Sequence, residues 1–169
     1  MELDKRDIAY SKVYAKVLNF LSFSKRSKKE LLDKIDKYIS KSGLDSKDKK
    51  SVKEQIILAL EKDGYLKDDT DVDFARSYIE GLRNSGKSLN YLKISHFLVK
   101  KGISKEIIDD FLGNLDKNLI HESALRDAKK KLSSLDKEDK YTKKKKLLNY
   151  LYRKGYPFDI SSSVVDTLL

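Results

Sequence analysis

The sequence predicts an all-α protein, an elongated array of helical repeats, and two observations carry this prediction. Residues 98–103 and 151–156 each end a basic helix with a glycine, and apolar residues follow both glycines at offsets of five, nine, ten and thirteen. That spacing places the apolar side chains on one helix face. The chain also lacks a convincing alternating run of Val, Ile and Thr, the pattern typical of strands.

The first 66 residues predict three helices. The first spans 7–21, with its expected core face on Ile8, Tyr14, Ala15, Leu18 and Leu21. The second begins at a capping box, Ser27-Lys28-Lys29-Glu30, and ends at Gly43, a C-cap residue. The third spans 46–62 and is expected to bury Val52, Ile56, Leu58, Ala59 and Leu60.

Residues 67–116 predict a second group of three helices. The acidic segment 67–71 opens the fourth helix, because carboxylates in a first turn complement the helix dipole. The fifth helix spans 89–101 and stops at Gly102, for which a left-handed C-cap conformation is expected. The sixth begins at Ser104 and ends near Gly113.

The third group comprises a helix over 118–133, a polar linker over 133–136, and helices over 137–154 and 157–169. The nine helices therefore divide into three tandem three-helix repeats, at residues 1–66, 67–116 and 117–169. One such unit buries too little apolar surface for secure stability, so neighbouring repeats are expected to share their apolar faces.

The net charge of +10, from 37 Lys and Arg against 27 Asp and Glu, favours a polyanionic partner. Residues 61–80 hold three basic and seven acidic side chains, so the positive charge is expected elsewhere and the surface should have distinct faces. The candidate partner-binding residues, for a protein filament or DNA, are Lys25, Arg26, Lys28, Lys29, Arg83, Lys87, Lys100, Lys101, Lys143, Lys144, Lys146, Arg153 and Lys154.

Each basic cluster also has a plainer interpretation. The cations around the start of the second helix, with its free amides, suit a phosphate or an acidic side chain, but a solvated corner is equally open. Consecutive lysines at 143–146 fan around their helix, which favours solvation for some of them. Tyr152 and Tyr156 beside Arg153 suit base stacking or an interface anchor, although packing of both rings between helices is slightly favoured.

No constellation for catalysis, a cofactor or a metal is found. There is no cysteine, and His96 and His121 lack a partner at zinc-site spacing. The aspartates at 68–73 lack the glycine and glutamate of a calcium loop, so helix capping is favoured. Gly86-Lys87-Ser88 lacks the upstream glycine of a phosphate-binding loop. Without a nucleophile and base pair a hydrolase is disfavoured, and a non-enzymatic protein without cofactor is expected.

Three features predict the compartment. No apolar run approaches the length that crosses a bilayer, and the charged N-terminus has no signal-peptide core behind it. The absence of cysteine suits a reducing compartment. We therefore expect a cytoplasmic protein. A monomer is the default expectation for its oligomeric state.

Four motifs, at residues 26–31, 64–75, 101–103 and 147–156, together resemble those of the RecX family, regulators of the bacterial recombinase RecA. Residues 26–31 resemble its R-S-x-x-E-L, and residues 64–75 resemble its G-Y-L-D-D-x-x-Y/F-A with Lys67 inserted. Residues 101–103 resemble its K-G-I, and residues 147–156 resemble its L-x-x-x-L-x-R-R-G-F/Y, with Lys154 at the second arginine. Ser88 and Leu89 stand where the family often has Gly-Pro. The positions at which this sequence departs from the family's motifs are therefore turns and contact positions.

The resemblance implies three tandem three-helix units in a curved molecule that docks in the groove of a RecA–single-stranded-DNA filament. It also implies restraint of filament growth, ATP turnover, strand exchange and co-protease activity. Positive modulation and direct DNA contact stay open at this point. The alternative is a sequence-tolerant nucleic-acid-binding helical-repeat module that acts without RecA, motivated by the net charge and the lysine clusters.

Overall fold

The computed structural model describes residues 4–169, which form nine α-helices, one 3-10 helix and no strand. The start of the charged N-terminal segment, residues 1–3, lies outside the described residues. The chain forms two compact units. Unit one holds the chain up to residue 74 together with 101–103, and unit two holds residues 75–100 and 104–169. The all-α prediction is confirmed.

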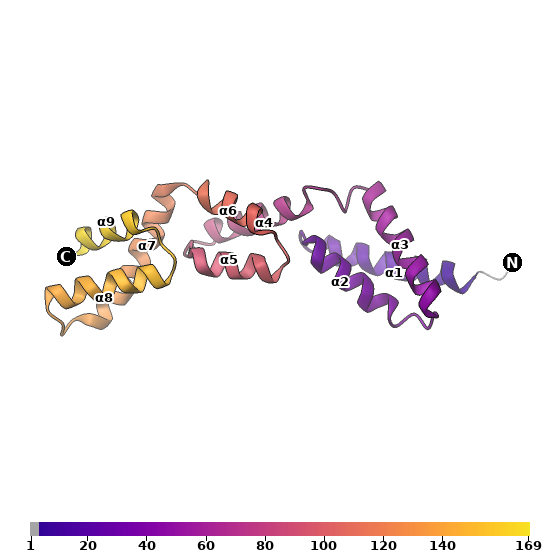
Figure 1. Cartoon of the computed structure of the whole chain (residues 1–169), viewed down its shortest axis with the longest axis horizontal. Helices are drawn as coiled ribbons and strands as arrows, with labels where there is room; N and C mark the ends of the chain where they lie inside the picture. The colour runs from indigo at the N-terminus through magenta and orange to yellow at the C-terminus, as the bar shows by residue number, and fades with distance from the viewer. Residues whose placement is uncertain (1–3) are drawn as a thin grey trace. The chain divides into compact units, whose positions relative to one another are not determined.

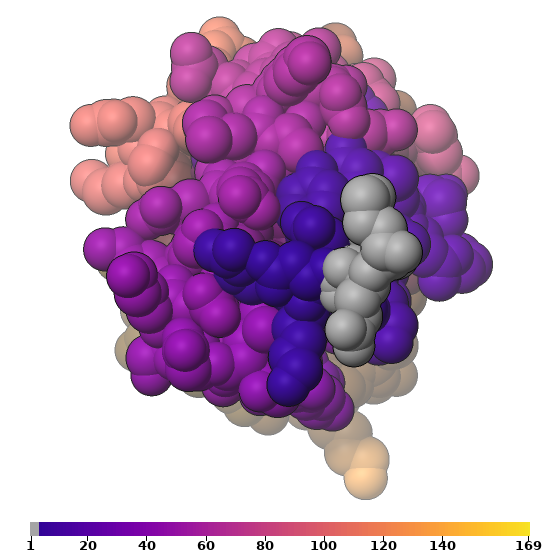
Figure 2. Space-filling view, turned by 90° about the vertical axis from the view of Figure 1, so that its right-hand side faces the viewer, coloured from indigo at the N-terminus to yellow at the C-terminus, as the bar shows by residue number. Residues whose placement is uncertain are grey.

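Unit one is built on three mutually packed helices, α1 (Lys5–Ser22), α2 (Lys28–Ile39) and α3 (Ser46–Lys62) (Figure 1). Each helix buries three apolar residues at a spacing of four, which lie on one face. These residues are Ala9, Val13 and Val17, then Leu31, Ile35 and Ile39, then Val52, Ile56 and Leu60. From the N-terminal end of this unit, the indigo atoms of α1 lie against the purple atoms of α3 (Figure 2).

Two details of the predicted core of unit one were wrong. Ile8 and Ala15 were expected inside, but both are exposed because α1 turns the face of Ala9, Val13 and Val17 inward. Leu58 was also expected inside and is 64% exposed. Leu58 lies two residues from both Ile56 and Leu60, which are buried. A step of two residues along an α-helix places a side chain on nearly the opposite side, so Leu58 faces away from the core.

The predicted helix ends are set by side-chain caps and glycines. The capping box is confirmed: Ser27 Oγ accepts a hydrogen bond from the Glu30 amide at 3.2 Å, and a Glu30 carboxylate oxygen accepts from the Ser27 amide at 3.3 Å. Gly102 and Gly155 have φ of 80° and 83°, which confirms the left-handed conformation expected at Gly102.

Helix α4 (Thr70–Asn84) begins in unit one and continues into unit two. Unit two also holds α5 (Tyr91–Lys100), α6 (Lys105–Gly113), α7 (Lys117–Leu132), α8 (Lys140–Arg153) and α9 (Phe158–Leu168). Helix α8 begins three residues later than predicted, because Asp139 is its N-cap and accepts from the Thr142 amide at 3.0 Å. The predicted linker contains a 3-10 turn, Ser133–Leu135.

The core of unit two lies among α7, α8 and α9, which pack together (Figure 1). Ile160, Val164 and Val165 are buried there, as their offsets after Gly155 predict. After Gly102, Ile107 and Phe111 are only partly buried and Ile108 is fully enclosed, because α6 packs mainly against α5. The repeat boundaries at 66 and 116 stay a prediction. Among residues 4–169, no helix has the length and apolar character required to span a membrane.

Candidate partner-binding site

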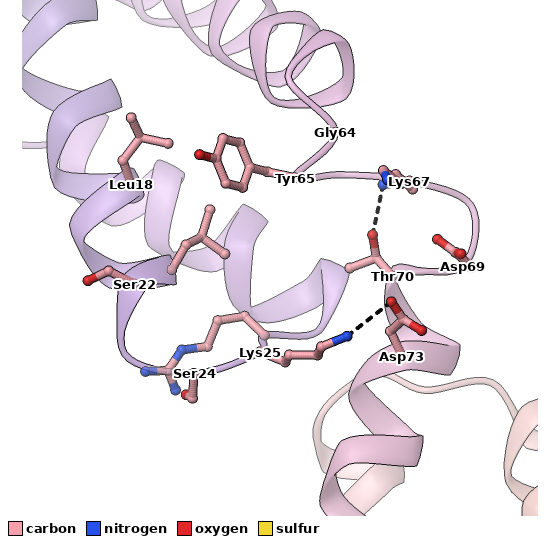
Figure 3. Close-up of a pocket in the computed structure, with 12 residues that line it drawn as sticks. Leu18, Ser22, Ser24, Lys25, Gly64, Tyr65, Lys67, Asp69, Thr70 and Asp73 are labelled. Atoms are coloured by element: carbon pink, nitrogen blue, oxygen red, sulfur yellow. Dashed lines mark hydrogen bonds and ion pairs between the residues drawn. The ribbon is translucent and has the colours of Figure 1, made fainter.

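The basic corner at the start of α2 is matched by carboxylates from α4 within unit one. Lys25 Nζ lies 3.2 Å from Asp73 Oδ2, and the Lys28 amide donates to Asp71 Oδ1 at 2.8 Å. Figure 3 shows Lys25 and Asp73 joined at the edge of a pocket of about 330 Å³. Asp73 therefore balances one cation of this corner, and Asp71 takes the place at the start of α2 that the sequence offered to a phosphate.

Arg26 and Lys29, two further cations of this corner, are also engaged inside unit one. The Arg26 guanidinium lies 4.1 Å from the centre of the Phe20 ring, and Lys29 pairs with Asp33 at 2.7 Å. Lys101 forms an ion pair with Glu30, the carboxylate of the capping box. Ser27 Oγ donates to the Lys101 carbonyl at 2.7 Å. The R-S-x-x-E-L box thus binds the segment 101–103 as well as capping α2.

A buried carboxylate in unit two holds Lys154. The Asp127 carboxylate, on α7, accepts from Lys154 Nζ at 3.0 Å, from Tyr156 Oη at 2.8 Å and from Ser88 Oγ at 3.0 Å. Asp127 is only 5% exposed. Lys154 Nζ also lies 4.9 Å from the centre of the Tyr150 ring. The second cation of the terminal motif is therefore an internal contact of the fold.

The contacts of this network set its protonation. Burial raises the pKa of Asp127, but hydrogen bonds from Lys154 and Tyr156 outweigh it and hold this pKa below its ordinary value. Burial lowers the pKa of Lys154, but Tyr150 and Asp127 outweigh it and raise this pKa overall. Burial, and then the bond to Asp127, raise the pKa of Tyr156. Asp127 and Lys154 are therefore charged, and Tyr156 is neutral, at neutral pH.

A cavity of about 530 Å³ opens beside this network. Its charged lining comprises five cations and one carboxylate, namely Lys87, Lys93, Arg126, Lys130, Lys154 and Asp127. Lys87 and Lys154 are among the predicted partner-binding residues, whereas Lys93, Arg126 and Lys130, which also line the cavity, are not. The four-residue spacing of Arg126 and Lys130 on α7 is a sequence signal for one basic helix face.

The C-terminal end of α8 presents an exposed aromatic ring beside a cation. Tyr152 is 74% exposed, and it lines a hollow of about 480 Å³ with Arg153, Lys131 and Asn149. Tyr156 is 2% exposed. The packing interpretation is therefore confirmed for Tyr156 and wrong for Tyr152, which follows the buried Leu151 and so lies on a different side of α8.

The remaining predicted residues divide by their contacts. Lys144 pairs with Asp166 at 2.7 Å, and Lys146 pairs with Glu138. Among residues 4–169, the following predicted cations form no ion pair: Lys28, Arg83, Lys87, Lys100, Lys143 and Arg153. No group of three His, Cys, Asp or Glu side chains that could hold a metal ion occurs in that same range.

The structure is that of a basic all-α protein, and comparisons with known proteins assign it to a family. A family model described as RecX, third three-helix domain, matches residues 121–165. Regulatory protein RecX of Clostridium tetani (strain Massachusetts / E88) is 31% identical over 163 residues, covering 95% of this chain and 68% of that protein. The chain belongs to the RecX family of regulatory proteins.

Other relatives agree with this assignment. Regulatory protein RecX of Clostridium botulinum (strain Eklund 17B / Type B) is 40% identical over 98 residues, which cover 56% of this chain. The chain spans less than half of that relative, 44% of its length. The crystal structure of RecX from Lactobacillus salivarius has a TM-score of 0.75 and 26% identity, covering 96% of this chain and 97% of that one. The three-helix repeats predicted from the sequence are thus those of this family.

Proposed function

We propose that this protein binds RecA and the RecA–single-stranded-DNA filament, and that it restrains the recombinase, ATPase and co-protease activities of RecA. Membership of a family of regulatory proteins supports a regulatory role. The observation that carries the proposal is the exposed pair Tyr152 and Arg153, which lies within the segment matched by the RecX third domain.

This pair has the chemistry of an interface anchor. Arg153 has no ion pair among residues 4–169, so a partner carboxylate or phosphate binds it without breaking an internal bond. Tyr152 offers a large apolar ring whose burial against a partner is favourable. Tyrosine and arginine are enriched among the residues that dominate binding energies.

The other cations without ion pairs would add weaker contacts. Arg83, Lys87, Lys100 and Lys143 lie in different parts of unit two, and Lys28 lies in unit one. Contacts of different repeats with neighbouring RecA protomers would sum to tight binding through multivalency. Binding through exposed cations weakens as salt screens the charges. We also propose that the protein acts as a monomer in the cytoplasm.

The test is the single-stranded-DNA-dependent ATP hydrolysis of RecA, measured while this protein is titrated at two salt concentrations. We expect inhibition below one protein per RecA protomer, weakening as the salt concentration rises. Unchanged hydrolysis at micromolar excess would refute the proposed regulation of RecA.

The anchor predicts the effect of single substitutions. Arg153→Glu and Tyr152→Ala should each weaken binding to the RecA filament by about tenfold or more, which corresponds to about 1.4 kcal/mol. Helicity should persist, because both side chains are exposed. Lys47→Glu, an equal charge reversal on an exposed residue of unit one, is the matched control. If Arg153→Glu and the control bind the RecA filament equally well, Arg153 is not part of the interface.

The same pair supports a second candidate, the nucleic-acid-binding module without RecA. An exposed tyrosine beside arginine and lysine can stack on a base while the cations hold the backbone. Gel-shift binding to bare single- and double-stranded DNA separates the two candidates. Tight, salt-sensitive binding that RecA leaves unchanged would favour the second.

A further inference from the structure

The cavity in unit two concentrates positive charge that the fold does not balance. Lys87 comes from the turn before α5, Lys93 from α5, Arg126 and Lys130 from α7, and Lys154 from the C-cap of α8. Asp127 is the single carboxylate in the lining, and Lys154, Tyr156 and Ser88 already occupy it. Lys87, Lys93, Arg126 and Lys130 have no ion pair within residues 4–169. Four cations therefore face one hollow without a counter-charge.

Two of the five cations are held in place. Lys154 is fixed by Asp127 at 3.0 Å and lies over the Tyr150 ring. Arg126 donates to Ser123 Oγ at 3.2 Å, and that buried hydroxyl also accepts from the Leu89 amide at 2.8 Å. A ligand therefore meets two positioned cations, and the exposed lysines 87, 93 and 130 can fold over it. Positioned donors lower the ordering cost of binding.

We propose that this cavity is a binding site for an oligophosphate anion, such as the di- or triphosphate group of a nucleotide. A volume of about 530 Å³ lies in the range of small-molecule sites. An oligophosphate brings several negative charges inside one small ligand, whereas a nucleic-acid backbone distributes one charge per nucleotide along an extended strand. Arginine and lysine are the side chains that bind phosphate oxygens in proteins.

The turn that supplies Lys87 has the sequence Gly86-Lys87-Ser88, which occurs in phosphate-binding loops but here lacks their upstream glycine. The hydroxyl of Ser88 is bound to Asp127, so this turn does not form such a loop. Its contribution to the site is the Lys87 ammonium, together with the first turn of α5. There Asn90 Oδ1 accepts from the Lys93 amide at 3.0 Å, which fixes the backbone that carries Lys93.

The experiment is calorimetric titration of the full chain with tripolyphosphate, ATP, inorganic phosphate and a short single-stranded oligonucleotide, without RecA. We expect one tripolyphosphate per chain, similar binding of ATP, and much weaker binding of inorganic phosphate. The triple variant Lys93→Gln, Arg126→Gln, Lys130→Gln should weaken tripolyphosphate binding by at least about tenfold. The control variant Lys47→Gln, Lys50→Gln, Lys145→Gln removes equal charge at exposed residues outside the cavity lining.

Equal affinity of the two triple variants would overturn the proposal, because binding would then follow net charge alone. Several tripolyphosphates per chain would overturn it for the same reason. An oligonucleotide that binds the cavity more tightly than tripolyphosphate would also overturn it, and would assign these cations to nucleic acid. Circular dichroism of both variants checks the fold. These measurements need no RecA, so their failure is distinguishable from failure of the proposed regulation.

Discussion

Replacing Gly102 with valine will destabilise the protein by about 2 to 5 kcal/mol. Gly102 has φ of +80°, which costs a residue with a side chain about 1 to 2 kcal/mol. A Cβ at this position would also lie 2.7 Å from Lys29 Cβ, and relief of such a clash typically costs about 1 to 3 kcal/mol. The change would strain the segment that Ser27 and Glu30 hold against the start of α2.

Gly43 provides the matched control for this prediction. Its φ is +74°, but nothing lies within 4 Å of a Cβ built there. Gly43→Val should therefore carry only the backbone strain, about 1 to 2 kcal/mol. Urea denaturation of both variants, followed by circular dichroism, measures the difference in the free energy of unfolding. Equal losses would show that the close approach to Lys29 has no energetic weight.

The sequence predicted the features of the fold that depend on neighbours in the chain. The capping box at Ser27 and the left-handed glycine at 102 are local signals, and both are found. The buried face of α9 followed from apolar spacing after Gly155. The buried face of α1 did not, because that helix carries apolar residues on more than one side and tertiary packing selects among them.

The contacts of the candidate site were beyond sequence reasoning for a different reason. Asp71 bonds the Lys28 amide across 43 positions, and Tyr156 bonds Asp127 across 29. The net charge of each segment predicts that the acidic residues before and within the start of α4 lie on a different face from the basic corner at the start of α2. In the fold these two segments lie in contact. Such pairings depend on which helices meet, and periodicity within a single helix does not contain that information.

Asp127→Asn will destabilise the protein by about 2 to 4 kcal/mol at neutral pH. The substitution leaves Lys154, whose side chain is only 24% exposed, without its carboxylate, and it weakens the bonds from Tyr156 and Ser88. Removing one partner of a buried ion pair costs more than the pair contributes, because the other charge stays desolvated.

Asp166→Asn is the control for this substitution, because it breaks an exposed pair. Asp166 and Lys144 lie 2.7 Å apart with about half of each side chain exposed, so solvent screens the pair and the loss should be much smaller than that of Asp127→Asn. Urea denaturation at pH 7 compares the two variants. Losses of similar size would show that the buried network adds no more stability than a surface ion pair.

The pH dependence of the same network gives an independent check. Because the pKa of Asp127 is lower in the folded protein than its ordinary value of 3.8, the stability from its ionised form is present above that value. This contribution is lost as the pH falls through the folded pKa. The stability difference between wild type and Asp127→Asn should therefore shrink as denaturation is repeated from pH 7 towards pH 3. A difference that stays constant would show that the amide's altered hydrogen bonds, and not the loss of the ionised carboxylate, account for the effect at pH 7.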